Sequence, residues 1–244
     1  MMMKKSLVLI IACAGLFSGY TSPQAAGIAH YRQLDMRMAA AAAKTATATT
    51  SPSIQKQLKQ KMNAESFPKL PTGLNATLTK TTHAFRVTYY SAAHQLALND
   101  AKVKNGTPAA MYSKKSYAKA ADAAQQINYF KADQGGDKVK LGHGITATMD
   151  RAAGSSYLHW TEDHCSFTIH AVNQEKDNPV GLGKKIVTSL ATTKLPKNIK
   201  KGAFTFEAHP SELANHVVWQ KDKAVYTLAA SQPKMILQMI TSLA

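Results

Sequence analysis

The chain has 244 residues, and its 30 Lys and Arg against 14 Asp and Glu give a formal net charge of +16 at pH 7. This length allows one or two domains with a substantial core. The excess of positive charge predicts anionic partners, such as nucleic acid, anionic lipid headgroups or phosphate-rich wall polymers. Two cysteines are too few for a disulfide-stapled scaffold.

Residues 1–27 have the pattern of a secretory signal peptide. A basic start precedes an apolar run of about a dozen residues, Ser6–Phe17, which is too short for an ordinary membrane span. Small residues near position 27 suit cleavage. Cys13 follows a lipobox-like Ile-Ile-Ala and is a candidate lipid anchor, with simple secretion as the favoured alternative. No later run reaches the ~20 apolar residues of a spanning helix, so we expect no transmembrane helix in the mature chain.

Residues 28–73 are predicted to form a low-complexity tether that contains a short basic helix. An Ala/Thr tract has little to pack and ends in Ser-Pro-Ser. In Ile54–Ala64, apolar residues recur every four positions and form a thin stripe on a basic helix. Pro68 and Pro71 then mark a boundary.

Residues 74–142 form the first predicted folded unit. Alternating Thr, Val, Tyr and Phe in 76–81 and 84–91 predict a β-hairpin. Apolar residues on one face predict a helix over Lys114–Lys131, capped by Ser113. A strand over 141–149 follows.

An internal repeat organises the rest of the chain, with copy one at 143–196 and copy two at 197–244. Trp160 matches Trp219, and IVTSLA at 186–191 matches MITSLA at 239–244. Each copy is predicted to have three strands and then a helix. The strands fall near 143–150, 156–161 and 165–172 in copy one and near 203–209, 215–219 and 224–230 in copy two, and the helices fall at 181–193 and 234–243.

These elements predict an α+β fold of antiparallel sheets with helices on one face. We expect it to be built from two strand-hairpin-helix repeats, with 74–142 as a candidate divergent third.

The C-terminal part resembles a domain of unknown function found in Gram-positive exported lipoproteins. The resemblance rests on Gly202-Ala-Phe-Thr-Phe, Trp219, the strand 225–228 and a final helix that ends at Leu243. It implies an envelope location and carries over no catalytic residue. Tyr20 stands where the lipobox of such proteins has its acceptor cysteine.

The sequence motifs typical of enzymes and metal sites are not recognised in the chain, so no catalytic or metal-binding residue is predicted. Cys165 matches an alanine in copy two, so we expect a buried, inert cysteine. The nine histidines lack the spacing of a helical metal-binding pair, so no metal and no cofactor is predicted. Trp160 and Trp219 are either repeated core anchors or a stacking platform for a ligand.

The basic residues are the strongest functional candidates, against the simpler alternative of a solvated face. Six lysines surround the helix of copy one and the loop that follows it, and they form the predicted polyanion-binding set: Lys184, Lys185, Lys194, Lys197, Lys200 and Lys201.

We therefore predict a non-enzymatic exported protein of a Gram-positive cell envelope. Its basic surface would associate with anionic wall polymers, without specific nucleic-acid binding. The alternative is a binding module of the wall space for a small or lipidic ligand held between sheet and helices. An enzyme would need a cleft that gathers His and Asp from both copies.

Overall fold

A computed structural model describes residues 52–62, 65–70, 73–131, 135–173, 177–209 and 212–244 of the chain. The predicted signal peptide, the candidate lipid anchor Cys13 and the Ala/Thr tract lie outside the described residues. No described helix is both long enough and apolar enough to cross a membrane.

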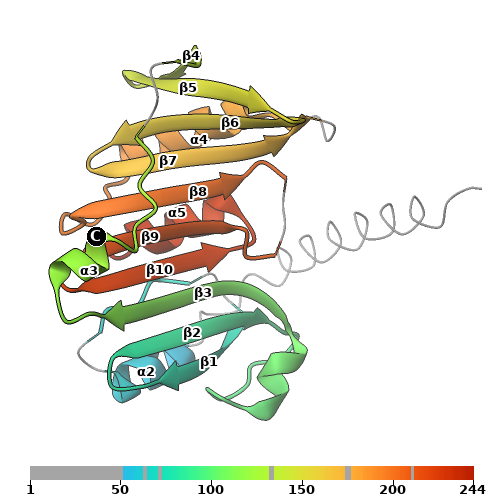
Figure 1. The fold of residues 1–244 in the computed structure, drawn as a ribbon. Coiled ribbons are helices and arrows are strands. Elements are labelled where there is room, and N and C mark those ends of the chain that lie inside the picture. Colours follow the sequence, from blue (N-terminus) through green and yellow to red (C-terminus); the bar gives the residue numbers. More distant parts are fainter. Residues whose placement is uncertain (1–51, 63–64, 71–72, 132–134, 174–176, 210–211) are drawn as a thin grey trace, which may run out of the picture. The chain divides into compact units, whose positions relative to one another are not determined.

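Ten strands form one continuous sheet in the order β1-β2-β3-β10-β9-β8-β7-β6-β5-β4 (Figure 1). The chain thus forms one edge of the sheet with β1–β3, crosses to the far edge, and returns strand by strand until β10 pairs with β3. The strands are β1 Leu74–Lys80, β2 Ala84–Ser91, β3 Thr107–Ser116, β4 Asp137–Gly142, β5 Ile145–Ala152, β6 Ser155–Glu162, β7 Cys165–Val172, β8 Lys201–Glu207, β9 Asn215–Lys221 and β10 Ala224–Ala230.

Tight turns explain why the returning strands pair with their sequence neighbours. The loops Ala153-Gly154 and Asp163-His164 each join two strands, and all four residues have positive φ. Two-residue turns of this left-handed kind match the twist of antiparallel strands.

One pair in the sheet is parallel, and it contradicts the predicted fold class. β7 and β8 run side by side, with Cys165 opposite Gly202 and His170 opposite Glu207. The helix α4 (Pro179–Thr192) connects them and carries the chain back to the end of the sheet where β7 began. The predicted antiparallel sheets of hairpin-helix repeats are therefore wrong, because both copies belong to one mixed sheet.

Three helices cover one face of this sheet, which we call the helix face. α2 (Pro52–Lys61), α4 and α5 (Pro233–Thr241) contribute to the same core as the alternate strand residues that point toward them. Ile54 and Leu58 of α2 are 2% and 0% exposed, so the thin apolar stripe of this basic helix is part of the core. The folded part thus extends upstream of residue 74.

On the opposite face, which we call the open face, the described residues place only a short crossover that includes α3 (Ala120–Ala124). β3 takes the first three residues of the predicted helix 114–131, and among the described residues of that segment the α-helix is limited to α3. The chain after α3 crosses the open face toward β4 (Figure 1), and Ile127 packs with Ala203 and Val225. The predicted helix is wrong over most of its length, because β3 pairs residues 114–116 with β2 and β10, and residues 125–131 continue as a crossover without helix.

Candidate functional site

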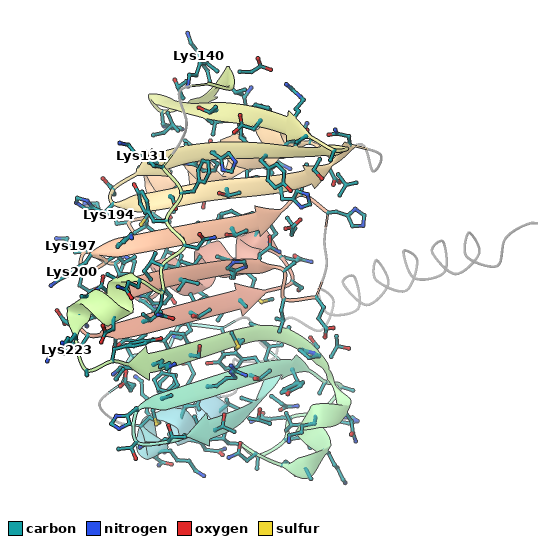
Figure 2. All side chains as sticks on the ribbon, in the orientation of Figure 1. Lys131, Lys140, Lys194, Lys197, Lys200 and Lys223 are labelled. Atoms are coloured by element: carbon teal, nitrogen blue, oxygen red, sulfur yellow. The ribbon has the colours of Figure 1, made fainter. Side chains whose placement is uncertain are left out.

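Exposed lysines gather at the end of the sheet where β3 and β9 finish and β8 and β10 begin. Figure 2 labels six of them: Lys194, Lys197 and Lys200 on the connection from α4 to β8, Lys223 in the β9–β10 turn, Lys131 on the crossover, and Lys140 within β4. We call this set, extended by its neighbours at the same strand ends, the basic margin. It consists of Lys115, Lys119, Lys131, Lys140, Lys194, Lys197, Lys200, Lys221 and Lys223, all exposed.

Among the described residues, fewer acidic groups than lysines lie at the basic margin: Asp222, Glu162 and Asp163 at the β6–β7 turn, and Asp122 of α3. Lys200 Nζ lies 3.6 Å from Asp222 Oδ1, and both side chains are mostly exposed. Such a solvated pair contributes little to stability. Asp222 also lies between Lys221 and Lys223 in the β9–β10 turn, so the local charge stays positive.

The fold divides the predicted polyanion-binding lysines into two groups. Lys194, Lys197 and Lys200 lie in the connection from α4 to β8 and belong to the basic margin. Lys201 starts β8, is partly buried, and places its Nζ 5.5 Å from the centre of the Tyr129 ring. Lys184 and Lys185 are exposed in the N-terminal half of α4, away from the margin.

A hollow of about 550 Å³ adjoins the basic margin on the open face. We call it the Arg86 hollow. Its lining includes four cationic side chains and five hydroxyl groups, and no carboxylate is among its lining residues. The polar and charged groups are Lys80, Arg86, Lys114, Lys115, Thr79, Thr81, Ser113, Thr227, Tyr117 and Gln126.

A second hollow, of about 420 Å³, lies at the same end of the sheet on the helix face. We call it the Tyr226 hollow. Three aromatic rings line it, and Tyr226 stacks on Trp219 with 5.3 Å between ring centres and 15° between planes. Lys114 Nζ stands 5.6 Å from the centre of the Tyr226 ring. Tyr112, Lys221 and Lys223 also line this hollow.

The two predicted stacking tryptophans have different surroundings. Trp160 is 1% exposed, and its ring stacks on Phe167 with 4.8 Å between centres. It is a core residue with no free ring face. Trp219 is 3% exposed but borders the Tyr226 hollow, where Tyr226 is the more accessible ring.

Lys114 links the two hollows and stays positively charged. Partial burial lowers its pKa, but its hydrogen bond to Glu65 and the nearby Tyr226 raise it more, so the net shift of the pKa is upward. A cation therefore stands where the two hollows meet.

A hydroxyl, an imidazole and a carboxylate form a row at the opposite end of the open face. Ser155 Oγ lies 3.1 Å from His170 Nε2, and Glu207 Oε2 lies 2.6 Å from His170 Nδ1. Serine hydrolases use this order of groups. Here, however, the Tyr157 ring stacks on the imidazole at 4.9 Å, and both hollows lie at the other end of the strands. The arrangement fits a polar network that ties β6, β7 and β8 together.

The described residues give no metal site and no reactive thiol. No cluster of three or more His, Cys, Asp or Glu side chains that could hold a metal ion occurs among them. Cys165 is fully buried on the helix face, and burial raises the pKa of its thiol to about 12. It is a small core residue, as its match to an alanine suggested.

Sequence reasoning missed the Arg86 hollow. The period-two alternation of the segment AFRVTYYS places Arg86 on the face opposite to Phe85 and Val87, and this could be read from the sequence. Most partners of Arg86 could not be read in this way. Thr79 comes from the neighbouring strand of the predicted hairpin, but the other partners come from β3 and β10, whose pairing with β2 and with each other was not predicted.

Comparison of the chain with protein families, with curated proteins and with solved structures finds no match.

Proposed function

We propose that this chain is a non-enzymatic exported protein of the cell envelope whose basic margin associates with anionic wall polymers. The observation that carries the proposal is the concentration of exposed, mostly unpaired lysines at one end of the sheet, beside a hollow lined by four cations and no carboxylate. A long polyanion can contact such a surface at many points at once. The attraction weakens as salt screens it.

Export and an envelope location are part of this proposal. They rest on the basic start and short apolar run of residues 1–27 and on the resemblance to the domain of Gram-positive lipoproteins. Anionic polymers with dense phosphate charge are partners that such a location supplies.

Retention of the full chain on isolated Gram-positive cell walls tests the proposal. Walls with and without their phosphate polymers are compared over a salt series. We expect retention that needs the polymer and fades as salt rises. Retention that is indifferent to both, or absent, contradicts the proposal.

Matched variants separate the basic margin from net charge alone. One variant replaces Lys194, Lys197 and Lys200 by Glu. The control replaces Lys59, Lys102 and Lys104 by Glu. These three lysines are exposed and lie on α2 and the 3-10 helix Ala101–Asn105. Both variants lose the same charge. We expect the first to lose about tenfold or more in affinity and the control to lose much less. Equal losses refute a localised site.

The Tyr226 hollow favours a second candidate function, a binding module for a small ligand. Its stacked rings and its lysines suit a polar ligand with a flat face, such as a sugar, better than a lipid chain. Titration of the chain with oligomers of N-acetylglucosamine, followed by tryptophan fluorescence, tests this function. Saturable binding that Tyr226→Ala abolishes supports it, and an unchanged spectrum refutes it.

A further inference from the structure

We propose that the Arg86 hollow is a phosphate-binding subsite that holds one phosphodiester unit of a linear polyol-phosphate polymer. This inference rests on the proposed function and names the chemistry of the polymer it would recognise.

Arg86 is the cation most available for such a role. Only two arginines lie in the described residues, and Arg151 is engaged by Asp137 at 2.6 Å. Arg86 is exposed on β2 and has no carboxylate partner among the described residues. A planar guanidinium with five N–H donors can hold two phosphate oxygens at once.

The register of four strands surrounds Arg86 with hydroxyl groups. Thr79 is opposite Arg86, Arg86 is opposite Ser113, and Ser113 is opposite Thr227. Directly opposite residues share a face of the sheet. The row therefore presents three hydroxyl groups next to one guanidinium on the open face. Thr79 Oγ1 donates to the backbone carbonyl of Arg86 at 3.4 Å, so Ser113 and Thr227 are the hydroxyl donors offered to a ligand.

Two further cations extend this row toward the basic margin. Lys115, one pleat further along β3, shares the open face with Ser113, and its Nζ lies 5.1 Å from the centre of the Tyr117 ring. Lys80 ends β1 and also lines the hollow. Neither lysine has an ion-pair partner among the described residues. A phosphate at Arg86 would therefore meet further positive charge on the side of the strand row that faces the basic margin.

The hollow also fits the parts of the polymer that lie between phosphates. Its volume of about 550 Å³ exceeds the volume of a phosphate group and leaves room for a flanking polyol. Val218 and Val225 provide apolar wall next to the hydroxyls of Thr227 and Ser113. Short carbon chains with hydroxyl groups match such a mixed lining.

A comparison of polymers tests the subsite. The probes are poly(glycerol phosphate) and polyglutamate, matched in number of charges, and binding of the full chain is measured by titration calorimetry at fixed salt. We expect Arg86→Gln to weaken binding of the phosphate polymer about tenfold or more. For polyglutamate we expect Arg86→Gln to lower the affinity less than about threefold, because the variant loses only one charge contact with this polymer.

Two control variants show whether geometry or charge is responsible. Arg151→Gln removes the same charge outside the hollow and should bind both polymers like the original chain. Arg86→Lys keeps the charge and removes the planar donor pair, so it should lose most of the preference for phosphate. Urea unfolding of each variant shows that the fold is intact.

The outcomes separate the two proposals. If the chain binds neither polymer, the proposed function and the subsite both fail. If the chain binds poly(glycerol phosphate), and Arg86→Gln weakens the binding of both polymers equally or has no effect on binding, only the subsite fails. Single-stranded DNA serves as a further probe. Binding of DNA as tight as that of the polyol polymer, with the same loss in Arg86→Gln, overturns the assignment to a polyol phosphate.

Discussion

Replacement of Gly202 by alanine tests the parallel strand pair on which the topology depends. An added Cβ at Gly202 would stand 2.8 Å from Cys165 Sγ and 3.4 Å from Ile199 Cγ2. The first distance is shorter than real Cβ contacts allow, so Cys165 or the strand must shift. Extra atoms forced into a packed core cost about 1–3 kcal/mol. We expect Gly202→Ala to lower the free energy of unfolding by that amount.

The double variant with Cys165→Ala makes this prediction specific. The single variant Cys165→Ala removes a buried sulfur and should cost about 1 kcal/mol. In the Cys165→Ala background, the methyl group that Gly202→Ala adds has room. There Gly202→Ala should be neutral or stabilise by up to about 1 kcal/mol, because alanine restricts the unfolded chain. The coupling energy between the two sites, which is the difference between these two effects, should then be about 1–4 kcal/mol.

Urea unfolding followed by tryptophan fluorescence measures all four free energies. Trp160 on β6 and Trp219 on β9 flank the β7–β8 pair, so the signal reports the part of the sheet that is perturbed. Effects that add within about 0.5 kcal/mol would mean that the two side chains do not meet. That result would refute the parallel register, and with it the single mixed sheet.

Three further predictions concern the core and its titrating groups. Leu58→Ala should lower the free energy of unfolding by about 2–5 kcal/mol, measured in urea, because Leu58 is fully buried; a loss below about 0.5 kcal/mol would mean that α2 is only a tether. Cys165 should resist a maleimide near neutral pH in the folded chain and react in concentrated urea, since burial raises the pKa of its thiol to about 12. Burial also lowers the pKa of His159, against the opposing charge of Asp150. The folded state therefore favours the neutral ring, so stability present above about pH 6.5 should fall as the pH drops below it. His159→Gln should show a smaller fall in its melting temperature between pH 7.5 and pH 5, and an identical fall contradicts this reasoning.

Local pattern was sufficient to predict most strands. The predicted hairpin near 76–91 corresponds to β1 and β2, and the six strands of the two copies correspond to β5–β10 within a few residues. Apolar and polar residues alternate strongly in these segments, and turn residues bound them. Their strand structure therefore depends little on which strands lie beside them.

The segment 107–131 could not be predicted in the same way. Helical spacing of apolar residues and several alanines favour a helix over 114–131, of which only α3 forms. The structure places 107–116 in the sheet, between β2 and β10. Pairing on both sides satisfies the backbone of 107–116, and these long-range partners cannot be read from the segment itself.

The cationic chemistry of the candidate site was predictable from the sequence, but the full set of residues that form the site was not. The lysine-rich connection 194–200 is visible in the sequence, as is the shortage of acids around it. Arg86 and Lys115 belong to other parts of the chain, and only the sheet order brings them to the same end. Lys184 and Lys185 are close in sequence to the connection, but the length of α4 separates them from it.

The parallel pair is also what brings the predicted lysines to the basic margin. α4 returns the chain to the end of the sheet where β7 began, so the connection 194–200 lies beside the β9–β10 turn and the end of β3. If β8 had followed β7 as an antiparallel hairpin, the same lysines would lie at the opposite end of the sheet, where β7 finishes beside Asp177. The charge cluster and the topology are therefore linked. A test that refutes the β7–β8 register would also remove the basis for a continuous basic margin.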